Sequence, residues 1–135
     1  MRRLSPVFVL AFAALLLVVA GCGGSDESDE EGATPAEAVA EIDEIKHMLA
    51  TAVDQVRDGD TASAEKTVGD AYLEHFEHVE APLGERDHDL MEELEEAIST
   101  DLRNDIKDGK PAAAIQSEVD AIEADLDKAV AVLQG

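Results

Sequence analysis

The sequence predicts an all-α protein, an antiparallel up-down-up-down four-helix bundle made of two helical hairpins. Two observations lead to this fold. After residue 33, apolar residues recur every three or four positions, which is the spacing of helices with one buried face. Short stretches rich in Gly, Pro and Asp interrupt this spacing at three places, leaving four segments of about 20 residues. Because the interruptions are short, each helix is expected to pack antiparallel to the next.

The first helix is expected to begin at Thr34-Pro35-Ala36-Glu37. Thr34 can cap the helix, Pro35 suits its first position and Glu37 completes a capping box. Gly59 ends the helix. Its apolar stripe consists of Val39, Ile42, Ile45, Leu49, Ala52, Val53 and Val56. The main alternative is a three-helix arrangement with a loose first helix.

The second helix is expected to start at Asp60 or Thr61 and to close at Pro82 and Gly84. Its apolar stripe consists of Val68, Tyr72, Phe76, Val79 and Leu83. The third helix is expected from about Asp87 to Lys107. Its stripe consists of Leu90, Leu94, Ala97, Ile98, Leu102 and Ile106.

The fourth helix is expected to begin at Pro111, and its apolar residues alternate in steps of four and three, as in a bundle helix. These residues are Ile115, Val119, Ile122, Leu126, Ala129 and Leu133. A faint internal repeat matches Val-Arg-Asp-Gly at 56–59 to Ile-Lys-Asp-Gly at 106–109, which indicates two copies of a helical hairpin. The helical prediction does not depend on this duplication.

The N-terminus has the pattern of a secretion signal. Arg2 and Arg3 precede an apolar run over 7–20, which is shorter than the roughly 20 residues of a membrane span. The following Val19-Ala20-Gly21-Cys22 resembles a bacterial lipobox. This resemblance implies cleavage before Cys22, acylation of its sulfur, and an extracytoplasmic protein anchored to a membrane by lipid. The alternatives are an ordinary signal cleavage site and an uncleaved transmembrane anchor.

Three regions follow from this pattern: a signal peptide at 1–21, a lipidated Cys22 with a linker at 22–33, and a helical domain at 34–135. The linker contains Gly, Ser and acidic residues without apolar periodicity, so it is expected to be a disordered tether. Cys22 is the one cysteine of the chain and cannot form an intrachain disulfide.

The formal net charge is −22, and removal of 1–21 with its two arginines would make it −24. Such acidity argues against a nucleic-acid partner, which would need clustered Lys and Arg. It provides many carboxylates, the ligands of hard cations, although a merely solvated surface is the simpler explanation. The sequence contains no Gly-rich phosphate loop and no Ser nucleophile motif, and Cys22 would be consumed as an anchor, so we expect no enzyme.

The candidate metal ligands are concentrated in the segment 72–80, which contains His75, Glu77, His78 and Glu80. His75 and His78 are three residues apart and share a helix face. Imidazole with carboxylate is a ligand set of Zn, Fe, Cu or Ni. Alternatively, these histidines are capped or solvated side chains without a ligand.

Asp101 and Asp105 are the expected facing partners, because on an ideal helix they fall near the centre of the third helix's apolar stripe. A buried aspartate is costly unless it is paired or bound to a cation. If that face meets His75 or Glu80, a mixed nitrogen and oxygen site would form inside the bundle. Alternatively, the two aspartates reach solvent or pair with Arg57 or Arg103.

The segment from Asp70 to Ile106 resembles the extracytoplasmic helical domain of some bacterial iron permeases of the FTR type. Tyr72, Phe76-Glu77, Glu80 and Leu102-Arg103 carry the resemblance, which covers about a third of the chain after Cys22. It implies a detached domain that binds or passes iron or another cation near a permease. The permease's own Arg-Glu-x-x-Glu motif and membrane spans are absent from the sequence, so the chain is not expected to be the transporter.

A weaker similarity links the chain to helical periplasmic iron-uptake lipoproteins of the imelysin type. Their His-x-x-Glu motif is not met, because His75-Phe-Glu-His78 ends in His. The sequence therefore supports two functions. One is a lipid-anchored accessory of metal uptake that binds iron or another transition metal, with a metal permease or another envelope protein as partner. The other is a non-catalytic structural or protein-interaction module of the cell envelope without a metal.

Overall fold

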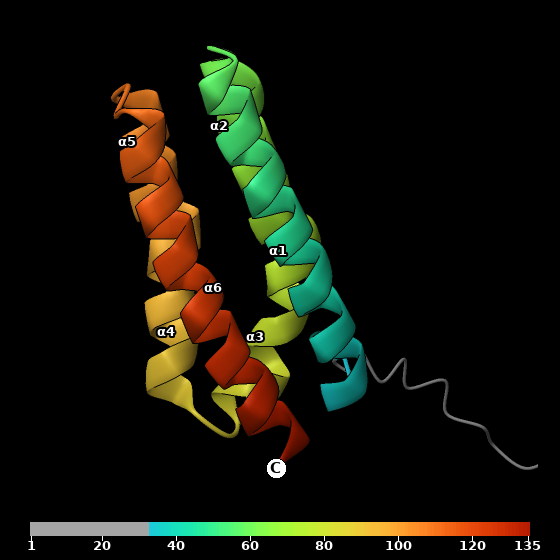
Figure 1. Ribbon diagram of the computed structural model, residues 1–135. Helices are drawn as coiled ribbons and strands as arrows, with labels where there is room; N and C mark the ends of the chain where they lie inside the picture. Colours follow the sequence, from blue (N-terminus) through green and yellow to red (C-terminus); the bar gives the residue numbers. More distant parts are fainter. Residues whose placement is uncertain (1–32) are drawn as a thin grey trace, which may run out of the picture.

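Four helical rods, separated by short turns, make up residues 33–135, the part of the chain that the computed structural model describes (Figure 1). The first rod is α1 (Pro35–Arg57) and the fourth is α6 (Ala112–Gln134). The described residues contain no strand, so the all-α prediction is confirmed. The predicted signal peptide, Cys22 and the linker up to residue 32 lie outside the described residues.

The two middle rods each contain a π-helical segment, in which hydrogen bonds reach one residue further than in an α-helix. The second rod is formed by α2 (Thr61–Asp70), the π-helix η1 (Ala71–Phe76) and α3 (Glu77–Gly84). The third rod is formed by α4 (His88–Glu96), the π-helix η2 (Ala97–Leu102) and α5 (Arg103–Lys107).

The first helix begins with the predicted capping box. The Thr34 hydroxyl accepts a hydrogen bond from the Glu37 backbone N–H at 3.3 Å, and the Glu37 carboxylate accepts one from the Thr34 N–H at 2.8 Å. Pro35 occupies the first helical position, where a missing N–H costs nothing. Local residue types therefore fix where α1 starts.

Two turns at the same end of the molecule have the same geometry. Gly59 and Gly109 adopt φ angles of 82° and 74°, the left-handed conformation that glycine tolerates without strain. Beyond each glycine, the next N–H reaches back five residues, from Asp60 to the Gln55 carbonyl and from Lys110 to the Asp105 carbonyl. The matched sequences at 56–59 and 106–109 thus form matched turns.

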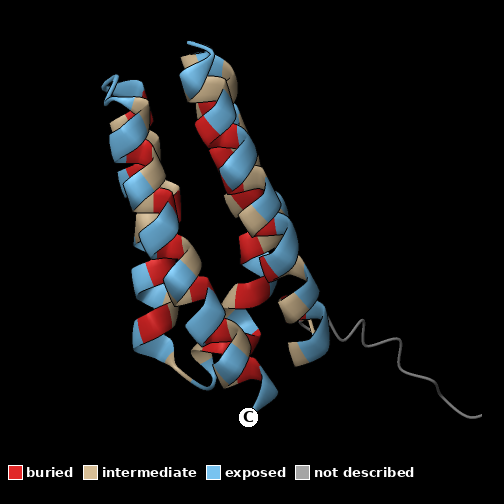
Figure 2. Ribbon diagram, in the orientation of Figure 1, coloured by how far each residue is buried: buried red, intermediate tan, exposed pale blue. Residues whose placement is uncertain are grey.

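One apolar core joins all four rods (Figure 2). The first helix contributes Ile42, Ile45 and Leu49, all fully buried, and it packs against both α6 and the second rod. The alternative of a loose first helix is therefore wrong. Phe76 of η1 is the largest fully buried side chain, and no polar or charged residue among those described is buried as a whole.

The third rod corrects the prediction for Asp101 and Asp105. Its buried residues are Leu90, Leu94, Ile98, Leu102 and Ile106, each four positions after the last. Four residues turn an α-helix by about 400°, so over four such steps the stripe would drift by about 160°. The wider turn of η2 offsets this drift and keeps Leu102 and Ile106 in the core. Asp101 is consequently exposed and Asp105 half-buried, so neither lies at the centre of the stripe.

Candidate functional site

The six predicted ligands lie in three separate groups. His75 and His78 face the first helix. Glu80 lies at the contact between the second and third rods, with Glu77 nearby. Asp105 lies where the third rod meets α6, with Asp101 nearby. Within residues 33–135, no group of three or more His, Cys, Asp or Glu side chains is already arranged to hold a metal ion.

The first group is built on a hydrogen-bonded contact between rods. The Nδ1 atom of His75 lies 2.6 Å from Oε2 of Glu41 in α1. The two side chains are 23% and 32% exposed, so water screens the pair only in part. His75 comes from the end of η1, next to the buried Phe76, and this fixes its side of the rod. The contact that His75 makes is therefore with α1.

A groove of about 310 Å³ adjoins this pair and is lined by Ala33, Glu37, Glu41 and His78. Glu37 already serves the helix cap, and hydrogen bonds from the Thr34 N–H and hydroxyl hold the pKa of its carboxyl below the ordinary value. His78 is exposed, so its imidazole can turn in the groove. One imidazole and two carboxylates thus line one surface depression between the first and second rods, and His75 adjoins it through its contact with Glu41.

The second group is centred on Tyr72 in η1. Its hydroxyl donates a hydrogen bond to Oε1 of Glu95 in α4 at 3.3 Å, and its ring stacks on Phe76 with centroids 6.0 Å apart. Burial, together with the nearby carboxylates of Glu80 and Glu95, raises the pKa of Tyr72 to about 12. The phenol therefore keeps its proton at ordinary pH.

Glu80 shares this Tyr72 hydroxyl. Burial raises the pKa of the Glu80 carboxyl, repulsion from Glu95 and Glu77 adds to the rise, and the Tyr72 hydrogen bond opposes it. One carboxyl oxygen, Oε1, is buried and has no hydrogen-bond partner within residues 33–135. Glu77 itself is exposed on the same rod.

The third group includes Asp105. Lys110 forms an ion pair with Asp105 across the turn at Gly109, and this hydrogen bond lowers the pKa of the aspartate. Glu118 of α6 adjoins the pair, and burial followed by its contact with Asp105 raises the pKa of Glu118 to about 7. Asp101 and Glu118 also line a shallow acidic groove between the third rod and α6.

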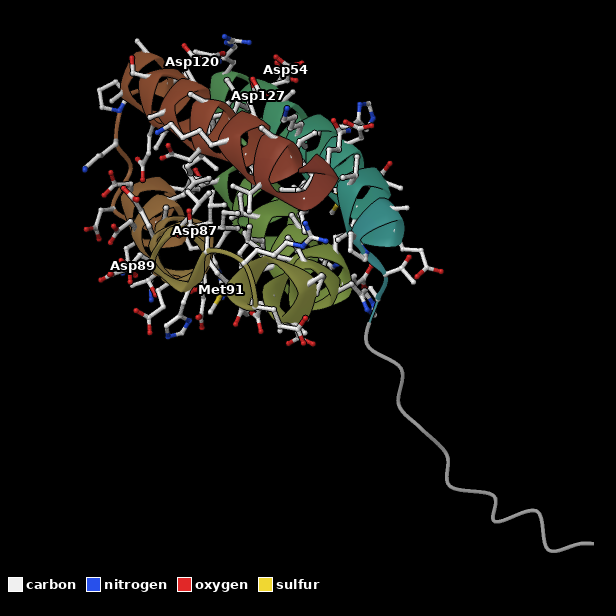
Figure 3. All side chains as sticks on the ribbon, turned by 90° about the horizontal axis from the view of Figure 1, so that it is seen from below. Asp54, Asp87, Asp89, Met91, Asp120 and Asp127 are labelled. Carbon is white, nitrogen blue, oxygen red and sulfur yellow. The ribbon has the colours of Figure 1, made fainter. Side chains whose placement is uncertain are left out.

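Sequence reasoning missed Glu41, Glu95 and Glu118, each of which faces a titratable side chain of another rod. Glu41 directly precedes the buried Ile42, and its position at the edge of the first stripe was a usable signal. Glu41 does not stand out in the sequence, because the chain contains 32 acidic residues. Figure 3 shows several of the other acidic side chains: Asp54, Asp89, Asp120 and Asp127 project outward from the helices.

The other two histidines lie apart from these groups. His47 is exposed on α1, and His88 lies 3.4 Å from Glu92 one turn further along α4. Both are separate from the His75–Glu41 pair and therefore serve as internal controls.

Comparisons with protein-family models, with curated proteins and with solved structures found no match to this chain. Among the helices formed by residues 33–135, none combines the length and apolar character that a membrane crossing requires.

Proposed function

We propose that this chain is a lipid-anchored extracytoplasmic helical protein that binds a transition-metal cation as an accessory to metal uptake. Cys22 would carry the lipid after removal of 1–21. The four rods would form an up-down-up-down bundle, which the short turns and the contacts between successive rods support. A metal permease of the same membrane is the proposed partner.

One observation carries the metal proposal: the groove beside the His75–Glu41 pair gathers His78, Glu37 and Glu41 from two rods. Imidazole nitrogen favours Zn, Fe, Cu and Ni, and a carboxylate completes a common ligand set for these ions. The groove is open to solvent, so an ion can enter without unfolding the bundle. Binding would require side-chain rotation, for which the exposed His78 is free.

The net charge of −22 supports cation capture in a second way. A surface potential of one sign raises the local concentration of oppositely charged ions and speeds their arrival. This attraction is diffuse and is screened within about 8 Å at physiological salt. Selectivity therefore has to come from the two imidazoles.

Calorimetric titration of the full chain in detergent micelles tests the proposal, at about 0.15 M salt where diffuse attraction is screened. The titrants are ferrous, cupric, zinc and calcium ions. We expect one saturable site for a transition metal, lost in the His75→Ala/His78→Ala variant and kept in the matched His47→Ala/His88→Ala variant. Equal, non-saturating heats for all four ions would reject a metal function.

A non-catalytic interaction module without a metal is the second candidate, and the surface near Leu73 favours it. Leu73 is 57% exposed, the one large apolar side chain so exposed within residues 33–135. It adjoins a groove that also contains Ala62, Gly69 and the ion pair of Lys66 and Asp70. Crosslinking from a photoreactive residue at position 73 in cells should then recover one envelope protein. Crosslinking from position 47 serves as the control.

A further inference from the structure

The ring nitrogens of His75 have different surroundings. Nδ1 lies 2.6 Å from the Glu41 carboxylate, whereas Nε2 has no hydrogen-bond partner within residues 33–135 and is not among the buried unpartnered atoms. The pair joins two rods whose backbones are fixed by the core, through Ile42 beside Glu41 and Phe76 beside His75. The orientation of the imidazole is therefore set by the fold.

This contact determines where the ring carries its hydrogen. An ionised carboxylate can only accept hydrogen bonds, so the atom facing Glu41 has to be the N–H of the imidazole. A neutral His75 paired in this way has its hydrogen on Nδ1 and its lone pair on Nε2. A metal ion binds a neutral imidazole through the lone pair, so Nε2 is the nitrogen available to it.

We infer that Glu41 is a positioning residue that presents Nε2 of His75 to a divalent transition metal and is not itself a ligand. This inference rests on the proposed function and deepens it. Metal-binding histidines commonly donate their second ring N–H to a carboxylate, which fixes the ring and raises the basicity of the bound nitrogen. His78, three residues further along the same rod, supplies the second imidazole from the groove that Glu41 lines.

The inference also selects the class of ion. With Glu41 paired to His75 and Glu37 bound to the Thr34 cap, the groove offers imidazole nitrogen ahead of free carboxylate oxygen. Calcium and magnesium prefer several oxygen ligands, whereas zinc, copper and nickel accept imidazole readily. The site should therefore bind a transition-metal dication such as zinc more tightly than calcium.

The first readout needs no metal. Long-range ¹H–¹⁵N spectra of the full chain in detergent, at about pH 8 where an ordinary histidine is neutral, distinguish the protonated ring nitrogen from the bare one. We expect the Nδ1–H form for His75 in the wild type and loss of this preference in Glu41→Ala. Glu41→Gln should preserve it, because the amide oxygen still accepts the hydrogen bond. His47, remote from Glu41, should be unchanged in both variants.

The second readout is zinc affinity measured by calorimetry on the same proteins. Glu41→Ala should weaken binding by about 10–100-fold while one site remains, as for other residues that orient a metal ligand. Glu41→Gln should recover most of that loss, and His75→Ala should remove the site. Glu44→Ala is the matched control, because it removes the same charge from an exposed position of the same helix. It should leave the zinc affinity unaltered.

The outcomes separate the inference from the function on which it rests. An Nε2–H form in the metal-free wild type, or a zinc affinity indifferent to Glu41→Ala, overturns the positioning role while metal binding stands. Complete loss of zinc in Glu41→Gln also overturns it, because Glu41 is then a direct ligand. Absence of zinc binding in the wild type, with the Nδ1–H form observed, removes the metal function and with it the role of Glu41 toward a metal.

Discussion

Tyr72 and Glu95 connect the second and third rods through a single hydrogen bond, from the phenol Oη to Oε1 at 3.3 Å. The Glu80 carboxyl also accepts a hydrogen bond from this hydroxyl. One phenol hydrogen thus serves two carboxylates, and Oε1 of Glu80 remains buried without a partner in the described chain. When both glutamates are ionised, the contact lacks one hydrogen-bond donor. The packing of the second rod against the third is therefore sensitive to pH.

The ionisation of Tyr72 can be observed directly, because the chain contains one Tyr and no Trp. Burial and the two carboxylates raise the pKa of Tyr72 to about 12. Absorbance at 295 nm should therefore stay flat through pH 10 and rise only near pH 12. The same titration in denaturant should show the ordinary midpoint near 10. A midpoint near 10 in a protein that retains its helical circular dichroism would contradict the burial of this hydroxyl.

Glu80→Gln is expected to stabilise the protein at neutral pH. Folding raises the pKa of Glu80, so its favourable contribution is complete below the ordinary pKa and is lost as pH rises through the folded-state value. Glutamine is neutral at every pH and its amide can donate a hydrogen. The melting temperature at pH 7 should increase by a few degrees, on the scale of about 4–8 °C per kcal/mol for a domain of this size.

The control for Glu80 is Glu44→Gln, which removes the same charge from an exposed position of α1. It corrects for the general relief of repulsion in a chain of net charge −22. If the two variants melt at the same temperature at pH 7, the burial of Glu80 contributes nothing of its own.

Glu118 should give the bundle a pH dependence in a higher range. Burial and the adjoining Asp105 raise its pKa to about 7, above the ordinary 4.5. The sign is the same as for Glu80: stability should be greatest near pH 4.5 and should fall as pH rises to about 7. Chemical denaturation at several pH values should show a flatter profile for Glu118→Gln. The exposed Asp120→Asn on the same helix should retain the wild-type slope.

Gly59 and Gly109 are expected to resist substitution. Both have positive φ, so alanine at either position should cost about 1–2 kcal/mol, although no neighbouring atom obstructs a Cβ. Gly84→Ala provides the contrast, because Gly84 is helical and its Cβ would make ordinary van der Waals contacts with Met91 at 3.5 Å and His88 at 4.0 Å. Denaturant midpoints should fall for the first two variants and stay level or rise for the third. Equal effects at all three positions would indicate that φ is irrelevant.

Much of the architecture was predictable because its causes are local. The capping box of Thr34 and Glu37 starts α1, and the left-handed Gly59 and Gly109 end two rods through hydrogen bonds that span only a few residues. The apolar positions of α6 follow the four-three pattern of an ordinary helix, and all six predicted residues are buried. Short-range chemistry of this kind can be recognised without knowledge of the partner.

The candidate site was less predictable for two reasons. The π-helix η2 rotates the end of the third rod, so Asp101 lies in solvent although ideal helix geometry placed it in the core. The strict four-residue spacing from Leu90 to Ile106 was the available sign of this rotation. The second reason is the pairing of side chains between rods. No residue next to His75 in the sequence indicates that its partner is Glu41.

The sequence by itself determined four helical rods, their turns and most of the residues that form the core, because capping, glycine conformation and apolar spacing act within a few residues. Only the tertiary structure decided that His75 faces Glu41, that Tyr72 serves both Glu80 and Glu95, and that Asp105 lies with Lys110 and Glu118. The physical reason is that side chains at the edges of helices meet according to how the rods pack and rotate. The chain has 32 acidic residues, and the packing of the rods determines which few of their carboxylates are partly buried and meet a side chain of another rod.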